Sequence, residues 1–458
     1  AEQTFAAITN TPGLRNAGAT YGGRTILYED CQRDIALRIT PELLSPVLPA
    51  LSLLLQSLRW LMQSMALEFH RLFRQTLSEI SGAGGCPEIR LLAWWLYTEP
   101  KLLSASSLAD VDQLFRKKWA EILPVNPDKT AIYLKSGDLK EKIDSLFPER
   151  GPGFYPVRYF CPDLMLAAAS VEDIKHGNLL YVLGEVHSGK NTLCHAALVE
   201  QHPDRLELVE ATKWDLSSAC FKILNTHETA TTTVRTSEGF LRPDDFLVAT
   251  TADAVAPSGF DSHAIADLVL QEEEEQLYAI HQPTGRRFHI LEAFSDLLFM
   301  FVMNKATWIQ PMPHAPRVLI DQLVIHRETW RFTQDQLAFA REKDESMRFL
   351  GARRWMNKHG IPRRTFIKTV SEIKPFYLDL DSPVLVENFC RAVRRMNPPD
   401  EKREEITVSE MLPTTEQLWL KDSAGASYTS ELRFAIVDLM ARSFSQMQDL
   451  NAPFGRTK

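Results

Sequence analysis

The chain has 458 residues, of which 45% are hydrophobic, with 51 Lys and Arg against 59 Asp and Glu and a formal net charge of -8. This size and apolar content predict a globular protein with a sizeable core and two to four domains or subdomains. Because the chain is acidic overall, any basic surface must be a local feature of it. The most apolar runs, residues 43–61 and 297–303, are interrupted by polar residues or too short to span a bilayer.

The six cysteines lie far apart and predict reduced thiols in a cytoplasm rather than a disulfide framework. No two of them have CxxC spacing, so neither a zinc site nor other metal chemistry is expected. The start of the chain shows no signal-peptide pattern, which also predicts a cytoplasmic location. Residue 1 is Ala rather than Met, which predicts a processed chain or a piece of a longer one. The cysteines are Cys31, Cys86, Cys161, Cys194, Cys220 and Cys390.

Residues 1–150 predict a mainly helical subdomain. Apolar residues recur at helical spacing from Pro41 to Ile80, and the glycine-rich stretch 81–85 ends the run. A helical hairpin or two packed helices is the simplest arrangement for this segment. Residues 86–150 again show helical spacing, and residues 149–153 mark a candidate boundary.

Residues 151–316 predict a β-rich subdomain, and residues 317–458 an α/β subdomain. Short strands are expected at 179–183, 246–251, 266–270 and 277–280, with the acidic run 271–276 at the tip of a hairpin. Residues 311–316 form a proline-rich linker, 318–324 predict one strand, and 374–383 predict a strand that runs into a turn. The expected fold class is therefore α+β, mixed, with a helical amino-terminal part followed by β-rich and α/β parts.

The stretch from Gly184 to Thr192 fits the GxxxxGK pattern of a phosphate-binding P-loop and follows a predicted buried strand. A P-loop needs Ser or Thr directly after the lysine, so that a hydroxyl can reach Mg²⁺. Here Asn191 holds that position. The pattern therefore argues against nucleotide binding, and a P-loop NTPase is the less favoured alternative.

Glu185 and His187 form a candidate catalytic pair within the same stretch. A histidine with a carboxylate partner can orient or deprotonate a hydroxyl near neutral pH. The same two residues can equally hold a turn together.

Positive charge is concentrated between Arg341 and Lys374, where ten Lys or Arg stand against four Asp or Glu. Such a local block predicts an anion-binding or phosphate-binding surface even in an acidic protein, whereas a solvated helix face is the alternative. The R-x-x-W-R pattern from Arg327 to Arg331 adds two guanidinium groups and an aromatic ring. The candidate nucleic-acid-binding residues are Arg327, Arg331, Arg353, Arg354, Lys358, Arg363, Arg364 and Lys368.

Four ordered blocks resemble the latter part of the glutamylation domain of class I lanthipeptide (lantibiotic) dehydratases, including split dehydratases of thiopeptide pathways. The blocks read RRWMNKHGIPRRTFIK, KPFYLDLDSPVLVE, SEMLP with QLWL, and YTSELRF; they begin at residues 353, 374, 409, 417 and 428. Residues 184–193 are similar to the family pattern GE-hydrophobic-H-x-G-x-N-T-L. A further resemblance, GGRTILYEDCQRD, begins at Gly22.

The resemblance implies an aminoacyl-tRNA-dependent transferase that moves glutamate from glutamyl-tRNA to Ser or Thr of a ribosomal precursor peptide. Such a site needs cations, a base and oxyanion donors, but no metal or ATP; glutamyl-tRNA is a co-substrate rather than a cofactor. It implies catalytic roles for Glu185, His187 and Arg433, and tRNA as the partner of the basic residues.

The resemblance covers nearly all of this chain but only about the latter two-thirds of a glutamylation domain. It predicts that an amino-terminal arginine cluster, a leader-peptide-binding region and a separate elimination domain belong to a partner chain or a missing segment. The chain is then an incomplete dehydratase, either a split subunit or a fragment. A non-catalytic subunit that binds tRNA or precursor peptide is the other alternative.

Overall fold

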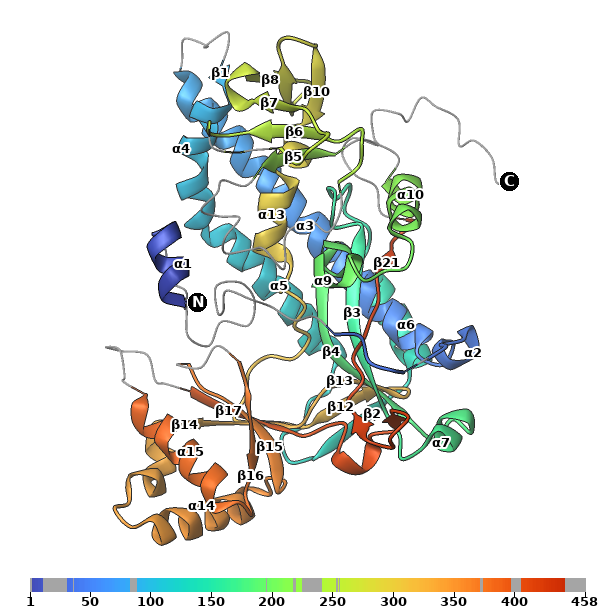
Figure 1. Ribbon diagram of the computed structural model, residues 1–458, viewed down its shortest axis with the longest axis vertical. Coiled ribbons are helices and arrows are strands. Elements are labelled where there is room, and N and C mark those ends of the chain that lie inside the picture. Colours follow the sequence, from blue (N-terminus) through green and yellow to red (C-terminus); the bar gives the residue numbers. More distant parts are fainter. Residues whose placement is uncertain are drawn as a thin grey trace.

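The structure is a computed structural model that describes residues 2–10, 31–35, 37–82, 89–194, 196–216, 220–224, 241–252, 254, 256–370, 374–396 and 405–440. It shows an α+β protein in which long helices pack beside several sheets (Figure 1). The predicted fold class is confirmed. The stretch resembling GGRTILYEDCQRD lies largely outside the described residues.

The helical part is organised around α3 (Leu48–Ser81), one continuous helix of 34 residues. The predicted helical hairpin is wrong, because residues 50–81 contain no glycine or proline that would break the run. Residues 60–66 are all buried, so the middle of α3 is covered on every side. The helices that pack against it are α4 (Leu91–Leu103), α5 (Ser106–Ile122) and α6 (Ser136–Leu146).

A seven-stranded sheet lies beside these helices, with the order β2-β12-β13-β4-β3-β20 and with β21 also paired to β3. The predicted single strand 318–324 is wrong. Asp321 has a φ of 54°, and this turn splits the segment into an antiparallel hairpin. The strands are β2 (Ala131–Leu134), β12 (Arg317–Ile320), β13 (Leu323–His326), β4 (Leu180–Ser188), β3 (Tyr159–Ala167), β20 (Leu432–Arg433) and β21 (Ile436–Val437).

Two smaller sheets form the upper part of Figure 1. One is parallel, with β5 (Phe221–Leu224), β6 (Phe246–Ala249) and β7 (Ser262–Ala264). The other is antiparallel, with β1 (Ile89–Arg90), β8 (Leu268–Glu273), β9 (Gln276–His281) and β10 (Arg286–His289). Glu274 and Glu275 have φ values of 48° and 65° between β8 and β9, so the predicted acidic hairpin tip is confirmed.

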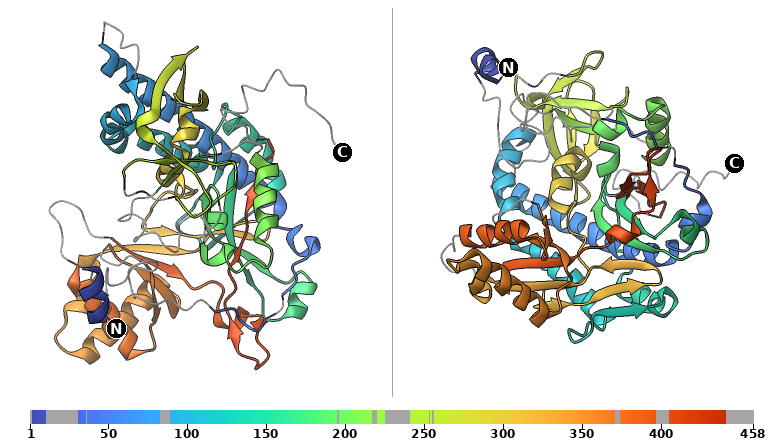
Figure 2. Two further views of the ribbon diagram at one scale, coloured as in Figure 1. Left: turned by 45° about the horizontal axis from the view of Figure 1, so that its top comes forward. Right: turned by 60° about the horizontal axis from the view of Figure 1, so that its bottom comes forward.

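A separate five-stranded antiparallel sheet has the order β11-β14-β17-β15-β16. Its helices α14 (Glu345–His359) and α15 (Pro383–Arg395) cover one face, as Figures 1 and 2 show. Asp344 and Ser382 cap the two helices, and Gly360 ends α14 in the left-handed region at φ 64°. The predicted strand and turn at 374–383 are confirmed by β16 and this cap. The strands are β11 (His314–Ala315), β14 (Thr329–Thr333), β17 (Glu405–Glu410), β15 (Arg364–Lys368) and β16 (Phe376–Asp379).

The five-stranded sheet and its helices have a core of their own, which runs from Trp330 to Val408. The larger core joins residues on both sides of position 150, from Val47 to Ile325, and also includes Trp419. The predicted division into residues 1–150, 151–316 and 317–458 stays a prediction.

A buried ion pair joins the five-stranded sheet to the seven-stranded one. Arg317 of β12 donates two hydrogen bonds to the carboxylate of Glu410 at the end of β17, from Nε at 2.7 Å and from the second guanidinium nitrogen. The Glu328 backbone N–H donates to the same carboxylate at 2.8 Å. Beyond β17, Leu412 packs against Val182 and Leu319, so the two sheets are also tied by apolar contact.

The remaining described elements are short helices, 3₁₀ turns and a two-stranded ribbon. None of the described helices combines the length and the apolarity that a bilayer crossing requires. These elements are α1 (Glu2–Thr9), α2 (Pro41–Leu44), α7 (Val171–Lys175), α8 (Asn191–Cys194), α9 (Ala196–Val199), α10 (Arg205–Leu216), η2 (Ile265–Asp267), α12 (Ile290–Ala293), α13 (Ser295–Val302), η3 (Gln334–Arg341), η4 (Thr415–Gln417), β18 (Leu420–Lys421) and β19 (Ser427–Tyr428).

Candidate functional site

The three predicted catalytic residues lie on neighbouring strands of the seven-stranded sheet. Glu185 and His187 are on β4, Arg433 is on β20, and β3 runs between these strands. On β3, Cys161 pairs with His187 and Asp163 pairs with Arg433. The sheet register therefore brings together residues that are far apart in sequence, with Asp163 at their centre.

A shift in the pairing register between β3 and β4 occurs at Asp163. The register shifts between Pro162 and Leu164, so that Asp163 alone lies opposite Gly184 and Glu185. A Cβ atom at position 184 would lie 3.3 Å from the Asp163 carbonyl oxygen, closer than is comfortable. Glycine at this position permits the close approach of the two strands.

His187 is buried and hydrogen-bonded on both ring nitrogens. Its Nδ1 atom lies 2.9 Å from Asn304 Oδ1, and its Nε2 atom lies 3.3 Å from the exposed Glu185 carboxylate. Burial opposes protonation of the ring, but the hydrogen bonds to Glu185 and Asn304 and the charges of Glu185 and Asp163 outweigh it. The pKa of His187 is therefore raised, which favours the imidazolium form.

Asp163 is a buried carboxyl group, 2% exposed, that titrates near neutral pH. Burial raises its pKa to about 7, with a further contribution from Glu431, whereas Arg433 acts in the opposite direction. The Oδ2 atom lies 3.7 Å from the guanidinium of Arg433, which is also 3.3 Å from Glu431. Among the described residues, no hydrogen-bond partner reaches Asp163 Oδ1.

Lys374, just before the first residue of β16 in the five-stranded sheet, acts on this cluster through its charge. The hydrogen bond from His187 contributes most to lowering the pKa of Glu185, and the charges of His187, Lys374 and Arg433 contribute as well. Lys374 lies two residues before β16. The charge of Lys374 therefore acts on the cluster, which we call the Asp163 cluster: Asp163, Glu185, His187, Glu431 and Arg433.

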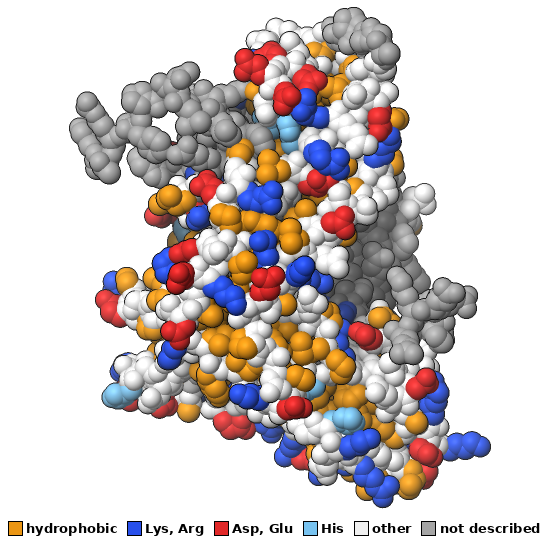
Figure 3. Space-filling model, turned by 180° about the vertical axis from the view of Figure 1, so that it is seen from behind, with side chains coloured by type: hydrophobic (Ala, Val, Ile, Leu, Met, Phe, Trp, Pro, Cys, Tyr) orange, Lys and Arg blue, Asp and Glu red, His pale blue; other side chains and the backbone are white. Residues whose placement is uncertain are grey.

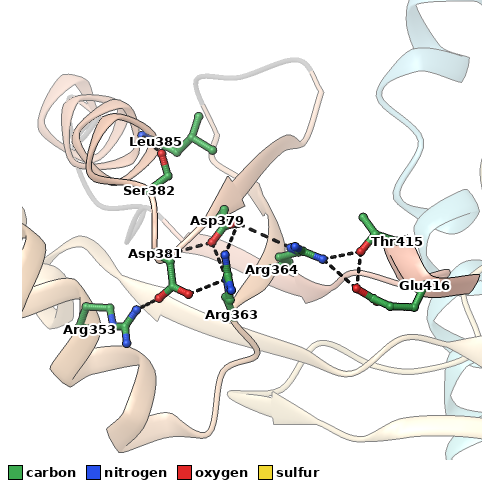
Figure 4. A network of polar contacts seen from close by, with 9 residues as sticks. All are labelled: Arg353, Arg363, Arg364, Asp379, Asp381, Ser382, Leu385, Thr415 and Glu416. Carbon is green, nitrogen blue, oxygen red and sulfur yellow. Dashed lines mark hydrogen bonds and ion pairs between the residues drawn. The ribbon is translucent and has the colours of Figure 1, made fainter. Parts of the chain in front are cut away.

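Three arginines of the predicted tRNA-binding block take part in a network of ion pairs, shown in Figure 4. Arg353 pairs with Asp381, and Arg363 lies 3.0 Å from Asp379 and 2.6 Å from Asp381. Arg364 bonds to Thr415 and lies 3.2 Å from Glu416. The carboxylates come from outside the window of residues 341–374 in which positive charge was counted.

The expectation that the block forms a strongly basic surface is therefore not met at these arginines, because folding places carboxylates beside them. Viewed from behind, the protein shows Lys and Arg side chains intermingled with Asp and Glu (Figure 3). A count of charge along the sequence cannot detect partners that come from later strands and turns. The tRNA-binding roles of these residues stay predictions.

The other predicted tRNA-binding residues fall into two groups. Arg327 is largely enclosed and donates to the carbonyl oxygens of Leu412 at 3.0 Å and Leu183 at 3.4 Å, so it braces the junction between sheets. Arg331 pairs with Glu405 at 2.9 Å. Arg354 and Lys358 are exposed one turn apart on α14, and Lys368 is partly exposed at the end of β15.

Comparison with known proteins shows which solved structures have a similar fold. Residues 306–389 match the family described as "Lantibiotic dehydratase, N terminus". The solved glutamylation domain TbtB, from thiomuracin biosynthesis, matches 86% of this chain with 14% identity and a TM-score of 0.53. The chain therefore has a fold similar to that of this glutamylation domain. It spans about half the length of the TbtB chain that it matches.

A second structure of the TbtB domain, bound to 5′-phosphodesmethylglutamycin, matches this chain with 15% identity and a TM-score of 0.52. The match covers 86% of this chain and 50% of that one. The tRNA-dependent lantibiotic dehydratase MibB from Microbispora sp. 107891 matches with 16% identity and a TM-score of 0.42, over 61% of this chain and 30% of that one. No curated protein matches the sequence.

Residues 184–192 do not form the loop that a P-loop would need. Gly184 to Ser188 belong to strand β4, and only Gly189 and Lys190 separate it from α8. Lys190 is buried and lies 3.5 Å from Asp296 and over the ring of Tyr155. The backbone that would wrap around a phosphate is already bonded in the sheet.

Sequence reasoning missed Asp163, Glu431, Asn304 and Lys374. Asp163 carried a usable signal, since it is the one acidic residue in the apolar run from Tyr159 to Ala167. Burying a carboxyl group in a sheet is unfavourable without a function or a partner. Nothing in the sequence around Asn304 or Lys374 indicates that they approach β4.

The raised pKa of His187 leads to a testable titration. In an NMR titration of the imidazole signals, we expect the His187 midpoint above 6.5 in the unmodified chain and a lower midpoint in Glu185→Gln. The reason is that the variant removes the negative charge that stabilises imidazolium, while burial continues to oppose it. Glu172→Gln serves as a control, since Glu172 lies on α7 near His176 and not near His187. A His187 midpoint that is unchanged by Glu185→Gln would contradict the pairing.

Proposed function

We propose that this protein is part of an enzyme that transfers glutamate from glutamyl-tRNA to Ser or Thr side chains of a ribosomal precursor peptide. The observation that carries the proposal is the Asp163 cluster, which supplies acid, base and cationic groups at one place on a fold like that of a glutamylation domain. This reaction requires neither a metal ion nor a nucleoside triphosphate.

The step is a transfer between two esters. The hydroxyl oxygen of the peptide forms a bond to the acyl carbon, the bond from that carbon to the tRNA ribose oxygen breaks, and the hydroxyl proton ends on the ribose. A base must accept the proton and an acid must return it to the leaving oxygen.

Asp163 and His187 suit these two roles. A carboxyl group with a pKa of about 7 is present in both forms at neutral pH, as a general acid and base must be. His187, with its raised pKa, can donate a proton to the ribose oxygen. Arg433 lies beside Asp163 and can stabilise negative charge on the substrate carboxylate or on the tetrahedral intermediate.

The direct test combines glutamyl-tRNA and the precursor peptide with this chain and the polypeptides encoded beside it. Mass spectrometry should show one or more glutamyl residues added to the precursor, and none when tRNA is uncharged. Binding of tRNA or precursor without any transfer would instead support the non-catalytic subunit. ATP or GTP binding that Lys190→Ala abolishes would favour the NTPase.

A further inference from the structure

Helices α14 and α15 cover one face of the five-stranded sheet, and the opposite face carries two partly exposed aromatic rings (Figure 2). Alternation along β15 sends Thr365 and Ile367 into the core and Phe366 to the opposite side. On β16, Leu378 is buried and Tyr377 faces the other way. Phe366 and Tyr377 are paired in register, their ring centroids are 6.1 Å apart, and each residue is 37% exposed.

The surroundings of these rings are polar and cationic. Across the sheet, Phe366 pairs with Ser409, while Lys368 and Arg331 both pair with Thr407. Arg331 is ion-paired with Glu405, but both side chains are partly exposed, and such pairs are weak enough to yield to a phosphate. A sheet face that packs against protein would be expected to carry aliphatic side chains instead.

This combination of exposed rings on adjacent strands, small polar neighbours and flanking cations is what single-stranded nucleic acid requires. Bases stack on the rings whatever their sequence, and the cations follow the backbone. Two rings side by side offer stacking positions for one or two bases.

The position of the rings relative to the Asp163 cluster indicates which nucleic acid they take. Tyr377 is three residues after Lys374, whose charge acts on Glu185. At about 3.3 Å per residue, the ring lies roughly 10 Å along the chain from Lys374. That span equals about three stacked nucleotides, at about 3.4 Å each.

We propose that Phe366 and Tyr377, flanked by Lys368 and Arg331, form a stacking platform for the unpaired bases at the 3′ end of the tRNA whose aminoacyl ester reacts at the Asp163 cluster. This rests on the proposed function. The platform holds the strand about three nucleotides from its reactive end and so sets how far the ester reaches.

The test compares two RNAs, an intact tRNA and the same tRNA trimmed of its unpaired 3′ nucleotides, by fluorescence anisotropy with the full chain. Phe366→Ala and Tyr377→Ala should each weaken binding of the intact tRNA by about 5- to 150-fold, the range for one lost base stack. Binding of the trimmed tRNA should be unchanged. Phe366→Tyr and Tyr377→Phe, which keep the rings, should bind like the original chain, and so should Tyr133→Ala, an exposed ring on β2.

Each result decides between the alternatives. Equal affinity of the alanine variants and the original chain for intact tRNA, with glutamyl transfer preserved, overturns the platform and leaves the proposed function standing; the face then serves a protein partner. Equal weakening for both RNAs also overturns it. If the original chain binds neither RNA and transfers no glutamate, the platform and the proposed function fail together.

Discussion

Replacing Arg433 by alanine should reduce glutamyl transfer by about 100-fold or more, the usual cost of removing a group that stabilises developing negative charge. The guanidinium is also the positive charge that opposes the rise in the Asp163 pKa caused by burial. Without it, that pKa rises above about 7, so less of the base is ionised at neutral pH. The rate of glutamate addition, followed by mass spectrometry, measures the loss.

The pH profile separates this role from a purely structural one. Because Arg433→Ala raises the pKa of the base, its activity should recover partly as the pH rises, and the ascending limb should lie at higher pH than in the original enzyme. Arg433→Lys keeps the charge and should retain more activity. Arg287→Ala removes an arginine that pairs with Glu273 on the β8–β10 sheet and serves as the matched control. An unshifted profile for Arg433→Ala would contradict the coupling to Asp163.

The contact between Glu185 and His187 could be predicted from the sequence, because the two residues are close together in the chain. Glu185 and His187 are two residues apart, just after the predicted strand 179–183, and the structure extends this strand through Ser188 as β4. Residues at that spacing share one face of a sheet. Their contact follows from local geometry alone. The proposal that they act in catalysis, in contrast, depends on neighbours that arrive from elsewhere in the chain.

The contact between Asp163 and Arg433 could not be predicted, because it depends on how distant strands pair. Asp163 meets Arg433 only because β20 pairs with β3 at that position. The same limit applies to charge, since the carboxylates of Asp379 and Asp381 belong to a later strand and turn that fold back on Arg363. Local patterns predict which elements form, whereas pairing between distant strands decides which side chains meet.

The long helix shows a different limit. The apolar spacing of residues 41–80 predicted helix correctly, but a segment of that length suggested two helices packed on each other. The decisive feature was the absence of any breaker from Ala50 to Ser81, together with the surrounding α4, α5 and α6 that bury α3. Helix length is thus set by where glycine and proline occur, and its burial by its neighbours.

Breaking the Arg317–Glu410 ion pair between the two sheets should destabilise the folded protein strongly. Arg317→Ala leaves the Glu410 carboxylate, 3% exposed, with the Glu328 N–H as its one hydrogen-bond donor among the described residues. We expect the free energy of unfolding to fall by about 2–3 kcal/mol. This is at or below the lower limit for breaking a fully buried pair, because the Arg317 side chain is 29% exposed. Denaturant unfolding followed by tryptophan fluorescence measures the change, and hydrogen exchange of residues 405–410 locates it.

A matched control lies on the same sheet. Arg331→Ala removes the partner of Glu405, which is exposed, so it should cost about 1 kcal/mol or less. The double variant Arg317→Met with Glu410→Leu should be less destabilised than Arg317→Ala, because neither charge is then left buried alone. If Arg317→Ala costs no more than Arg331→Ala, the carboxylate of Glu410 is reached by water and the two sheets are held together by the Leu412 contacts instead.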